Sequence, residues 1–511
     1  MRNACGARHL RLPLTAYAGR RYTGANMQTP HQAWLDCYLP QHADKLRARL
    51  QSPEWRRAID GGLVQRVAGA MPQPPSGPSP DAVVCSYLVS RNGDRVRTRI
   101  ASGDRDHESL VAELAKWSRD YERHPCSLTF VGLCLTFACN AVPRCLYCNQ
   151  RPTPELLTDA DWRAVIEQAA GQSAATGPYI YMTGGEPLLL GERLYGSNGL
   201  IRHATRLGCP VNINTNGFLL GPEVALQLVG SGLAKLHLSL DSAHAAVHDA
   251  LAGQEGRFHV VMRALLNLQI ARELLGGQQP IIHINCVLTR QNGWQFPRML
   301  AMLLRMKRTH TPGHEGPYRS DPHLRDLGVH LIPVGGASNA DRRLTADEVV
   351  RFYEHTWQEA AAEWDAYQEA IAVPVEQRLP FDDWAFFTSA YKRVRHGGDL
   401  QEYAAACSEG QYGRLALVGR CHISPSQAFV LPDGSQYWCG AHSVVRPEAL
   451  GNVRAAPLAR NIAAGLSGHG ALPNQRCLNC ATATLYLNQS IEATLREQVD
   501  RWVADADGAP N

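Results

Sequence analysis

The sequence lacks the long apolar runs, the charge excess and the cysteine density that mark several large classes of protein. No stretch approaches the roughly 18 continuous apolar residues of a membrane helix, so no membrane partner is expected. The formal net charge is only +4, which gives nucleic-acid binding no compositional support. Fifteen cysteines in 511 residues are too few for a disulfide scaffold. They cluster in two places, a pattern that favours metal ligation in a reducing, cytoplasmic compartment.

The chain is too long for one compact core, and its composition divides it into several regions. Residues 1–26 hold five arginines and no acidic residue, and we interpret them as a disordered or mis-assigned extension. Residues 27–71 are predicted to be helical. Residues 72–80 contain five prolines in nine positions, which is typical of a linker. In residues 81–125, Asn92-Gly93 between two strand-like runs predicts a β-hairpin, which a helix follows.

Residues 126–340 alternate between strand-like runs and amphipathic, helix-like segments. The six candidate strands are Ser127–Thr136, Tyr179–Thr183, Pro210–Asn214, Lys235–Leu240, Ile281–Leu288 and Gly328–Pro333. Such alternation is typical of parallel βα units in an α/β fold. Six units suit an open, partial (β/α)6 TIM-like barrel better than a closed barrel of eight. Residues 341–410 are predicted to be a helical insertion, and residues 411–511 a small cysteine-rich domain.

Three thiols lie within ten residues directly after the first of these strands, at Cys139, Cys145 and Cys148. Their loop therefore lies at the carboxyl end of a barrel strand, where barrel active sites are found. A structural zinc site usually takes four ligands. Three thiolates can instead hold three irons of a 4Fe–4S cluster and leave the fourth iron open. The cysteines alone leave both an iron–sulfur cluster and a structural zinc or inert thiols open.

A glycine-rich turn follows the second strand, in the run Thr183-Gly184-Gly185-Glu186-Pro187. Two glycines allow a ligand to approach the backbone closely. The carboxylate of Glu186 can accept a hydrogen bond from an ammonium group. The run is a weak signal by itself, and its position one βα unit past the cysteine loop is what gives it weight.

Together these segments resemble the radical S-adenosylmethionine (SAM) superfamily over roughly residues 127–335. The resemblance is carried, in the family's order, by the cysteine run ending in Tyr147-Cys148, by Thr183-Gly184-Gly185-Glu186-Pro187, Asn214-Thr215-Asn216-Gly217, Leu238-Ser239-Leu240-Asp241-Ser242, His248-Asp249 and Val287-Leu288-Thr289-Arg290-Gln291-Asn292. It implies an enzyme that cleaves SAM reductively and uses the 5′-deoxyadenosyl radical to abstract a substrate hydrogen. The chain departs from the family in two places. Five residues, rather than three, separate Cys139 from Cys145, and Ala252-Gly253 stands where an arginine often precedes the glycine.

The resemblance also assigns site residues. Cys139, Cys145 and Cys148 would ligate the 4Fe–4S cluster. The residues expected to contact SAM are Tyr147, Gly184, Gly185, Glu186, Asn216, Ser239 and Asp241. Among them, the glycine–glycine–glutamate run would hold the methionine end of SAM.

A second cysteine group lies near the end of the chain, at Cys421, Cys439, Cys477 and Cys480. The run Pro432-Asp433-Gly434 predicts a hairpin that brings the first two thiols together. Four thiolates also fit a zinc site. However, the pattern resembles the C-terminal extension of the SPASM and twitch subfamilies, in its shorter twitch form. That resemblance implies one auxiliary 4Fe–4S cluster with every iron held by cysteine.

The resemblance points to oxidative modification of a ribosomally made peptide or a natural product, with a flavodoxin or ferredoxin as electron donor. The hairpin and helix predicted in residues 82–122 would dock a leader peptide by adding a strand. Two alternatives remain open at this point. One is a radical dehydrogenase or epimerase that acts on a sugar, an aminocyclitol or another small molecule. The other is a zinc-stabilised binding protein on a degenerate barrel.

Overall fold

The computed structural model describes most of the chain. The described residues are 34–72, 79–118, 120–171, 177–385, 399–411, 421–445, 448–468, 477 and 484–508. The predictions made for residues 1–26, for most of the 72–80 linker and for Cys480 lie outside them. None of the helices in the described ranges combines the length and the apolar character needed to cross a bilayer.

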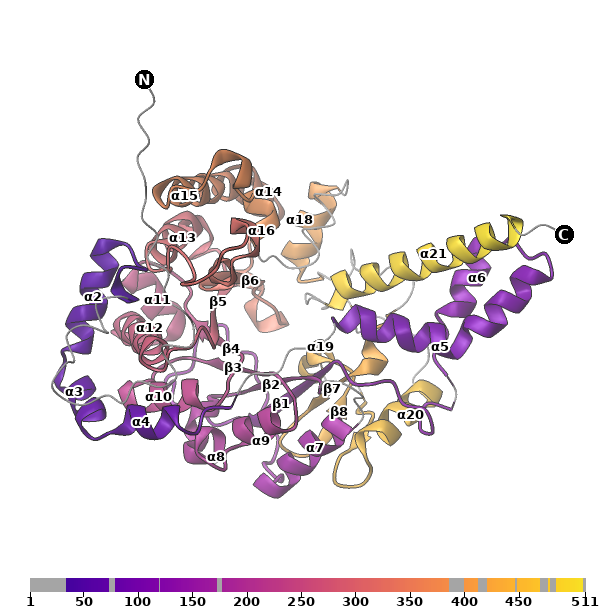
Figure 1. The fold of residues 1–511 in the computed structure, drawn as a ribbon, viewed down its shortest axis with the longest axis horizontal. Coiled ribbons are helices and arrows are strands. Elements are labelled where there is room, and N and C mark those ends of the chain that lie inside the picture. Colours follow the sequence, from indigo (N-terminus) through magenta and orange to yellow (C-terminus); the bar gives the residue numbers. More distant parts are fainter. Residues whose placement is uncertain are drawn as a thin grey trace.

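A nine-stranded sheet runs through the molecule in the order β6-β5-β4-β3-β2-β1-β7-β8-β9 (Figure 1). Its first six strands are β1 (Phe130–Thr136), β2 (Tyr179–Gly184), β3 (Val211–Thr215), β4 (Lys235–Ser239), β5 (Ile281–Leu288) and β6 (Gly328–Pro333). Each pairs in parallel with its neighbour in sequence. This confirms the six strands expected from the sequence and the α/β class.

Helices join these strands and cover one face of the sheet. They are α7 (Asp159–Gly171), α8 (Glu192–Tyr195), α9 (Leu200–Arg206), α10 (Pro222–Gly230), α11 (Ala245–Ala252), α12 (Arg257–Leu274) and α13 (Phe296–Leu304). Every second side chain of β2 and β4 is buried, and the buried ones, such as Met182 and Leu236, belong to the main hydrophobic core. Because side chains alternate across a strand, the partly exposed positions lie on the opposite, inner face of the sheet.

The C-terminal region continues this sheet. β7 (Gln427–Val430) pairs in parallel with β1, and β8 (Ser435–Tyr437) and β9 (Gly451–Asn452) follow in antiparallel pairing. The hairpin predicted at Pro432-Asp433-Gly434 is confirmed, because Gly434 has a φ of +86° in the turn between β7 and β8. β7 packs closely against β1. A Cβ at Gly132 would lie 2.2 Å from the ring of Phe429.

The remaining helices form the insertion and the C-terminal part. The described part of residues 341–410 is mostly helical. It contains α14 (Ala346–Arg351), a π-helical turn (Phe352–Thr356), α15 (Trp357–Ala370), α16 (Phe381–Trp384) and α18 (Leu400–Glu409). After it come α19 (Gly440–Val445), α20 (Leu458–Gly468) and α21 (Thr484–Gly508).

The hairpin predicted around Asn92-Gly93 is wrong, because Pro80–Ala101 forms one helix, α5. The Asn92 side chain donates to the carbonyls of Leu114 and Lys116 at 2.8 and 2.7 Å, so it holds the end of α6 (His107–Leu114). A Cβ at Gly93 would lie 3.2 Å from Trp502 of α21. The pair that signals a turn locally is used here for packing between helices. α5, α6 and α21 lie side by side in Figure 1 and share a separate hydrophobic core.

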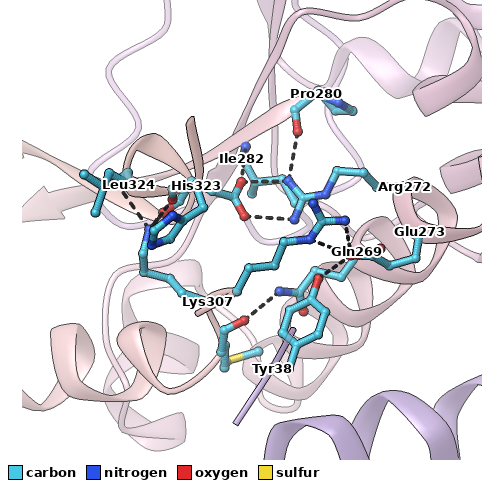
Figure 2. Close-up of polar contacts among 12 residues, drawn as sticks. Tyr38, Gln269, Arg272, Glu273, Pro280, Ile282, Lys307, His323 and Leu324 are labelled. Atoms are coloured by element: carbon cyan, nitrogen blue, oxygen red, sulfur yellow. Dashed lines mark hydrogen bonds and ion pairs between the residues drawn. The ribbon is translucent and has the colours of Figure 1, made fainter. Parts of the chain in front are cut away.

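The N-terminal helices pack on the barrel helices α10 and α12. They are α2 (Pro40–Leu50), α3 (Pro53–Asp60) and α4 (Leu63–Ala68). A buried polar network lies beside them, at the amino ends of β5 and β6 (Figure 2). Tyr38 donates to Glu273 at 2.7 Å, and Arg272 holds Asp326 through two hydrogen bonds of 2.8 Å. Asp326 also accepts from the backbone N–H of Ile282 at 3.0 Å, so one carboxylate ties α12 to both strands.

Replacing this carboxylate should destabilise the protein. Burial alone would raise the pKa of Asp326, but the charge of Arg272 holds it at about 2, below its ordinary 3.8. Asp326→Asn leaves Arg272 buried without its counter-charge. We expect it to lower the free energy of unfolding by about 3–5 kcal/mol at neutral pH. Denaturant unfolding followed by circular dichroism measures this loss.

The pH dependence supplies a second check. A carboxyl group with a depressed pKa in the folded state stabilises above its unfolded pKa, and this contribution is lost as the pH falls. The difference between wild type and Asp326→Asn should therefore shrink as the pH falls from about 4 towards 2. Asp44→Asn, which removes an exposed pairing with Arg47, is the matched control and should cost at most about 1 kcal/mol. Equal losses in the two variants would contradict the role of the network.

Candidate active site at the carboxyl ends of the strands

The three cysteines of the first group lie together in the loop that follows β1. Cys139 and Cys145 are partly exposed and Cys148 is exposed. The pKa of Cys145 is raised to about 11, chiefly by burial, with contributions from the negative charges of Asp241, Cys148 and Cys139. Three thiolates that repel one another in this way form a donor set that a cationic iron cluster would stabilise.

The extra residues between Cys139 and Cys145 lie against the turn between α11 and α12. Arg257 donates to the carbonyl of Pro143 at 3.2 Å, and the backbone N–H of Leu146 donates to the carbonyl of Leu251 at 2.9 Å. A Cβ at Gly253 would lie 2.8 Å from the Arg144 carbonyl oxygen. The two departures from the family pattern therefore meet in space, because the longer cysteine loop lies on the Ala252-Gly253 turn.

The glycine-rich turn after β2 packs directly against the backbone that leads into Cys139. The N–H of Gly185 donates to the Thr136 carbonyl at 2.7 Å, and that of Glu186 to the Ala138 carbonyl at 2.8 Å. A Cβ at Gly184 would lie 2.2 Å from the Thr136 oxygen, and one at Gly185 2.0 Å from the Ala138 oxygen. Both positions therefore require glycine because they contact the backbone of the cysteine loop closely. The expected contacts of the two glycines with SAM stay predictions.

Glu186 is fully buried and uses both carboxylate oxygens. It accepts hydrogen bonds from Leu188 N at 3.0 Å, Thr215 Oγ1 at 2.8 Å and Asn216 N at 2.8 Å. Burial raises its pKa to about 7, although these hydrogen bonds favour the charged form. The carboxylate therefore joins the turn after β2 to the end of β3. Its predicted contact with the amino group of SAM stays a prediction.

Asn216 continues this connection to the cysteine loop. Its side-chain amide donates to Asn140 Oδ1 at 2.7 Å and lies 3.9 Å from the sulfur of Cys139. Its own side-chain oxygen accepts from the N–H of Phe218 at 2.9 Å. The residue predicted to contact SAM thus lies beside a predicted cluster ligand.

Asp241 and Tyr147 form a second connection, between the end of β4 and the cysteine loop. The Tyr147 hydroxyl donates to one oxygen of Asp241 at 2.7 Å, and the N–H of Val287 donates to the other at 2.9 Å. Burial raises the pKa of Asp241 to about 6. Ser239, the last residue of β4, is partly exposed on the inner face. The predicted SAM residues therefore all lie at the carboxyl edge that carries the cysteines.

Two further residues hold the cysteine loop, and the sequence gave no signal for either. Glu155 accepts hydrogen bonds from Thr136 Oγ1 at 2.6 Å and from Phe137 N at 2.7 Å. Asn339 donates to the carbonyl of Tyr147 at 3.1 Å. Both contacts join segments distant in sequence, and neither residue lies in a recognisable motif.

The second cysteine group is described in part. Asn488 of α21 donates to the sulfur of Cys421 at 3.5 Å and accepts from the N–H of His422 at 2.7 Å. Cys439 is the second residue after β8, and the sulfur of Cys477 lies 3.5 Å from His442 Nε2. In the described ranges, no three His, Cys, Asp or Glu side chains are arranged around a single metal ion. A 4Fe–4S cluster differs from such a site, because each thiolate binds a different iron.

Residues 134–297 match the family model of the Radical SAM superfamily. The chain contains a radical SAM domain. The match runs from the end of β1 to the start of α13 and so includes the cysteine loop, the glycine-rich turn, Asn216 and Asp241. The family implies a 4Fe–4S cluster and SAM as cofactors.

Two curated relatives and one solved structure show the range of similarity. The chain is 30% identical over 308 residues to mycofactocin maturase MftC of Mycobacterium tuberculosis, covering 60% of this chain and 62% of the relative. It is 28% identical over 214 residues to PqqA peptide cyclase of Xanthomonas euvesicatoria, covering 40% and 54%. The chain thus spans little more than half the length of these relatives. The crystal structure of Streptococcus suis SuiB bound to S-adenosylmethionine aligns with a TM-score of 0.44 and 14% identity, covering 70% of this chain and 71% of that one.

A side chain at Gly185 should disrupt the cysteine loop. Gly185→Ala places a methyl group on the Ala138 carbonyl and must displace the backbone next to Cys139. We expect the variant to bind about four fewer irons per chain after anaerobic reconstitution. Iron and sulfide analysis measures this. Gly171→Ala, where an added Cβ meets nothing within 4 Å, is the control and should reconstitute like wild type. Full iron content in Gly185→Ala would show that the glycine contact does not position the loop.

Proposed function

We propose that the chain is a radical SAM enzyme that oxidatively modifies a ribosomally made peptide. The observation that carries the proposal is the convergence of Cys139, Cys145 and Cys148 at the carboxyl edge of the sheet, inside the segment that matches the family. The relatives described above support the substrate class, because one is named a maturase and the other a peptide cyclase.

The residues of the first site fit the two implied cofactors. Burial raises the pKa of the Cys139 and Cys145 thiols, the charge of Cys148 acts on both, and Asn216 is positioned to donate to the sulfur of Cys139. When bound, the cluster and SAM supply the reductive C–S cleavage that yields a 5′-deoxyadenosyl radical. Tyr147, through Asp241, holds the loop between Cys145 and Cys148 against the end of β4. The protein thus contributes position, and the cofactors contribute the hard chemical step.

The second cysteine group is proposed to hold one auxiliary 4Fe–4S cluster, with Cys421, Cys439, Cys477 and Cys480 as ligands. Four thiolates leave no iron open, which suits electron transfer rather than substrate activation. An auxiliary cluster could take the electron left on a substrate radical, as an oxidation requires. A flavodoxin or ferredoxin is the proposed electron donor to the first cluster, and the cytoplasm is the proposed compartment.

The docking of a leader peptide expected at residues 82–122 needs another site. Strand addition at residues 82–122 needs an exposed strand edge, and the described part of this region is helical. The sheet itself ends at β6 and β9 within the described residues. A peptide backbone would therefore find strand partners only at those two edges.

Anaerobic reconstitution followed by assay of 5′-deoxyadenosine tests the chemistry. Wild type should form 5′-deoxyadenosine from SAM with dithionite as reductant, and Cys145→Ala should not, because one iron loses its ligand. Cys126→Ala removes a buried thiol outside both groups and should retain cleavage. Undiminished cleavage in Cys145→Ala would refute the assignment. Purified protein that contains zinc and neither iron nor sulfide would favour the binding-protein alternative.

Incubation with a candidate precursor peptide tests the substrate class. We expect the reconstituted enzyme to change the mass of a precursor peptide encoded beside its own gene. Cys477→Ala should still cleave SAM but should yield less modified peptide, because the auxiliary cluster is impaired. If no such peptide binds and none is encoded nearby, the small-molecule alternative replaces the peptide proposal.

A further inference from the structure

Three histidines lie together on the inner face of the sheet, and the site described above uses none of them. They are His237 on β4, His283 on β5 and His330 on β6. The ring centroids of His237 and His283 are 5.4 Å apart, and those of His237 and His330 are 6.1 Å apart. Their neighbours in sequence, such as Leu236 and Ile282, are buried in the main core on the opposite face. The histidines therefore face the inside of the partial barrel.

The hydrogen bond of His237 fixes which of its two ring nitrogens carries the proton. Asn285 uses its side-chain amide to donate to Asn214 Oδ1 at 2.9 Å, so its oxygen faces His237 Nδ1 at 2.8 Å and accepts the proton there. In the neutral ring, Nε2 is then an acceptor. If the ring takes up a second proton, Nε2 becomes a charged donor, which an anion would bind.

A cation without a counter-charge lies below the histidines. The ammonium of Lys235, at the start of β4, lies 5.9 Å from the ring centroid of Tyr179. It forms no ion pair or hydrogen bond within the described parts of the chain, and its side chain is partly buried. The Tyr179 hydroxyl is buried and has no hydrogen-bond partner among the described residues. Buried charges are normally paired, so these unpaired donors are suited to bind an anion.

The lowered pKa values of the histidines agree with a surplus of positive charge on this face. Burial is the main cause that lowers the pKa of His237 to about 3 and that of His330 to about 4, and the positive charges of His330 on His237 and of Lys235 on both rings contribute to these values. Among the groups on neighbouring elements, the charge of Lys235 on β4 lowers the pKa of all three histidines, that of Asp326 before β6 raises the pKa of His283, and the ring of Tyr181 on β2 contacts His237. An anion among them would oppose the repulsion and raise the pKa of the imidazoles.

An aromatic surface adjoins the histidines on the same inner face. The ring of Tyr181 lies 6.3 Å from that of His237 and 6.0 Å from that of Phe130. Phe130 belongs to an apolar cluster with Phe429, Leu431 and Tyr437 of the C-terminal strands. The inner face therefore has a basic, hydrogen-bonding half over β4–β6 and an aromatic half over β1, β7 and β8, with Tyr181 between them.

We propose that this inner face is the substrate subsite, with His237, His330 and Lys235 binding a carboxylate of the substrate and the aromatic half binding an apolar or aromatic group attached to it. The proposal rests on the proposed function and names the class of group that the enzyme would hold. At about 3.3 Å per residue, His237 lies roughly 7 Å below Ser239, the carboxyl end of β4. A group bound there extends naturally towards the edge that carries the cysteines.

Binding of small probes to the reconstituted enzyme tests this subsite without turnover. Phenylacetate carries a ring and a carboxylate, and phenylacetamide is its neutral counterpart. We expect calorimetry to show phenylacetate binding at least about tenfold more tightly than phenylacetamide, the effect of a charged hydrogen bond. Binding should be accompanied by proton uptake and weaken from about pH 6 to about pH 8, because the imidazoles must be protonated to donate.

Variants assign the effect to the histidines. His237→Gln should weaken phenylacetate about tenfold and leave phenylacetamide unchanged. His259→Gln, on the exposed face of α12, is the control and should change neither. Equal binding of the two probes, or phenylacetate binding that His237→Gln does not alter, would overturn the subsite. An enzyme that cleaves SAM but does not discriminate between the probes would refute the subsite alone. Discrimination without SAM cleavage would refute the proposed function alone.

Discussion

The buried carboxylate of Glu186 is the constraint on which the first site depends. Its two oxygens accept three hydrogen bonds, from the turn after β2 and from the end of β3, and its backbone N–H donates to the residue before Cys139. One residue thus fixes three strand ends relative to one another. Removing the acceptor would leave buried donors unpaired, at a cost of about 1–3 kcal/mol each. The hydrogen bond from Asn216 N to Glu186 also fixes the position of Asn216 beside the sulfur of Cys139.

The continuous sheet gives the two cysteine groups a common frame. β1, which leads into the first group, pairs with β2 on one side and with β7 on the other. β7 and β8 lead to Cys439, while Asn488 on α21 contacts Cys421 and α21 packs on α5. The C-terminal region and the N-terminal accessory helix therefore support the second group together. The inner face of this sheet, from His330 to Tyr437, is shared by the barrel and its extension.

Much of the barrel could be predicted from the sequence because its signals are local. Short apolar runs alternating with amphipathic segments located β1 to β6, and Pro432-Asp433-Gly434 located the β7–β8 turn. The hairpin prediction at Asn92-Gly93 was wrong because contacts with distant segments override the local signal. In isolation the pair favours a turn, but here Asn92 binds the end of α6 and Gly93 makes room for Trp502. The order of the site residues was also predictable. The roles of Glu155 and Asn339 were not, because both act through contacts between distant segments that no local pattern encodes.

Glu186→Gln tests the central claim most directly. The variant keeps the size of the side chain but turns one oxygen into an NH2 group, which must face a donor such as Asn216 N–H or Leu188 N–H. Electron paramagnetic resonance of the reduced, reconstituted enzyme, with and without SAM, reports on the first cluster. We expect the signal that responds to SAM to be lost or strongly reduced, while circular dichroism and the auxiliary signal are retained. An unchanged SAM-responsive signal in Glu186→Gln would contradict it.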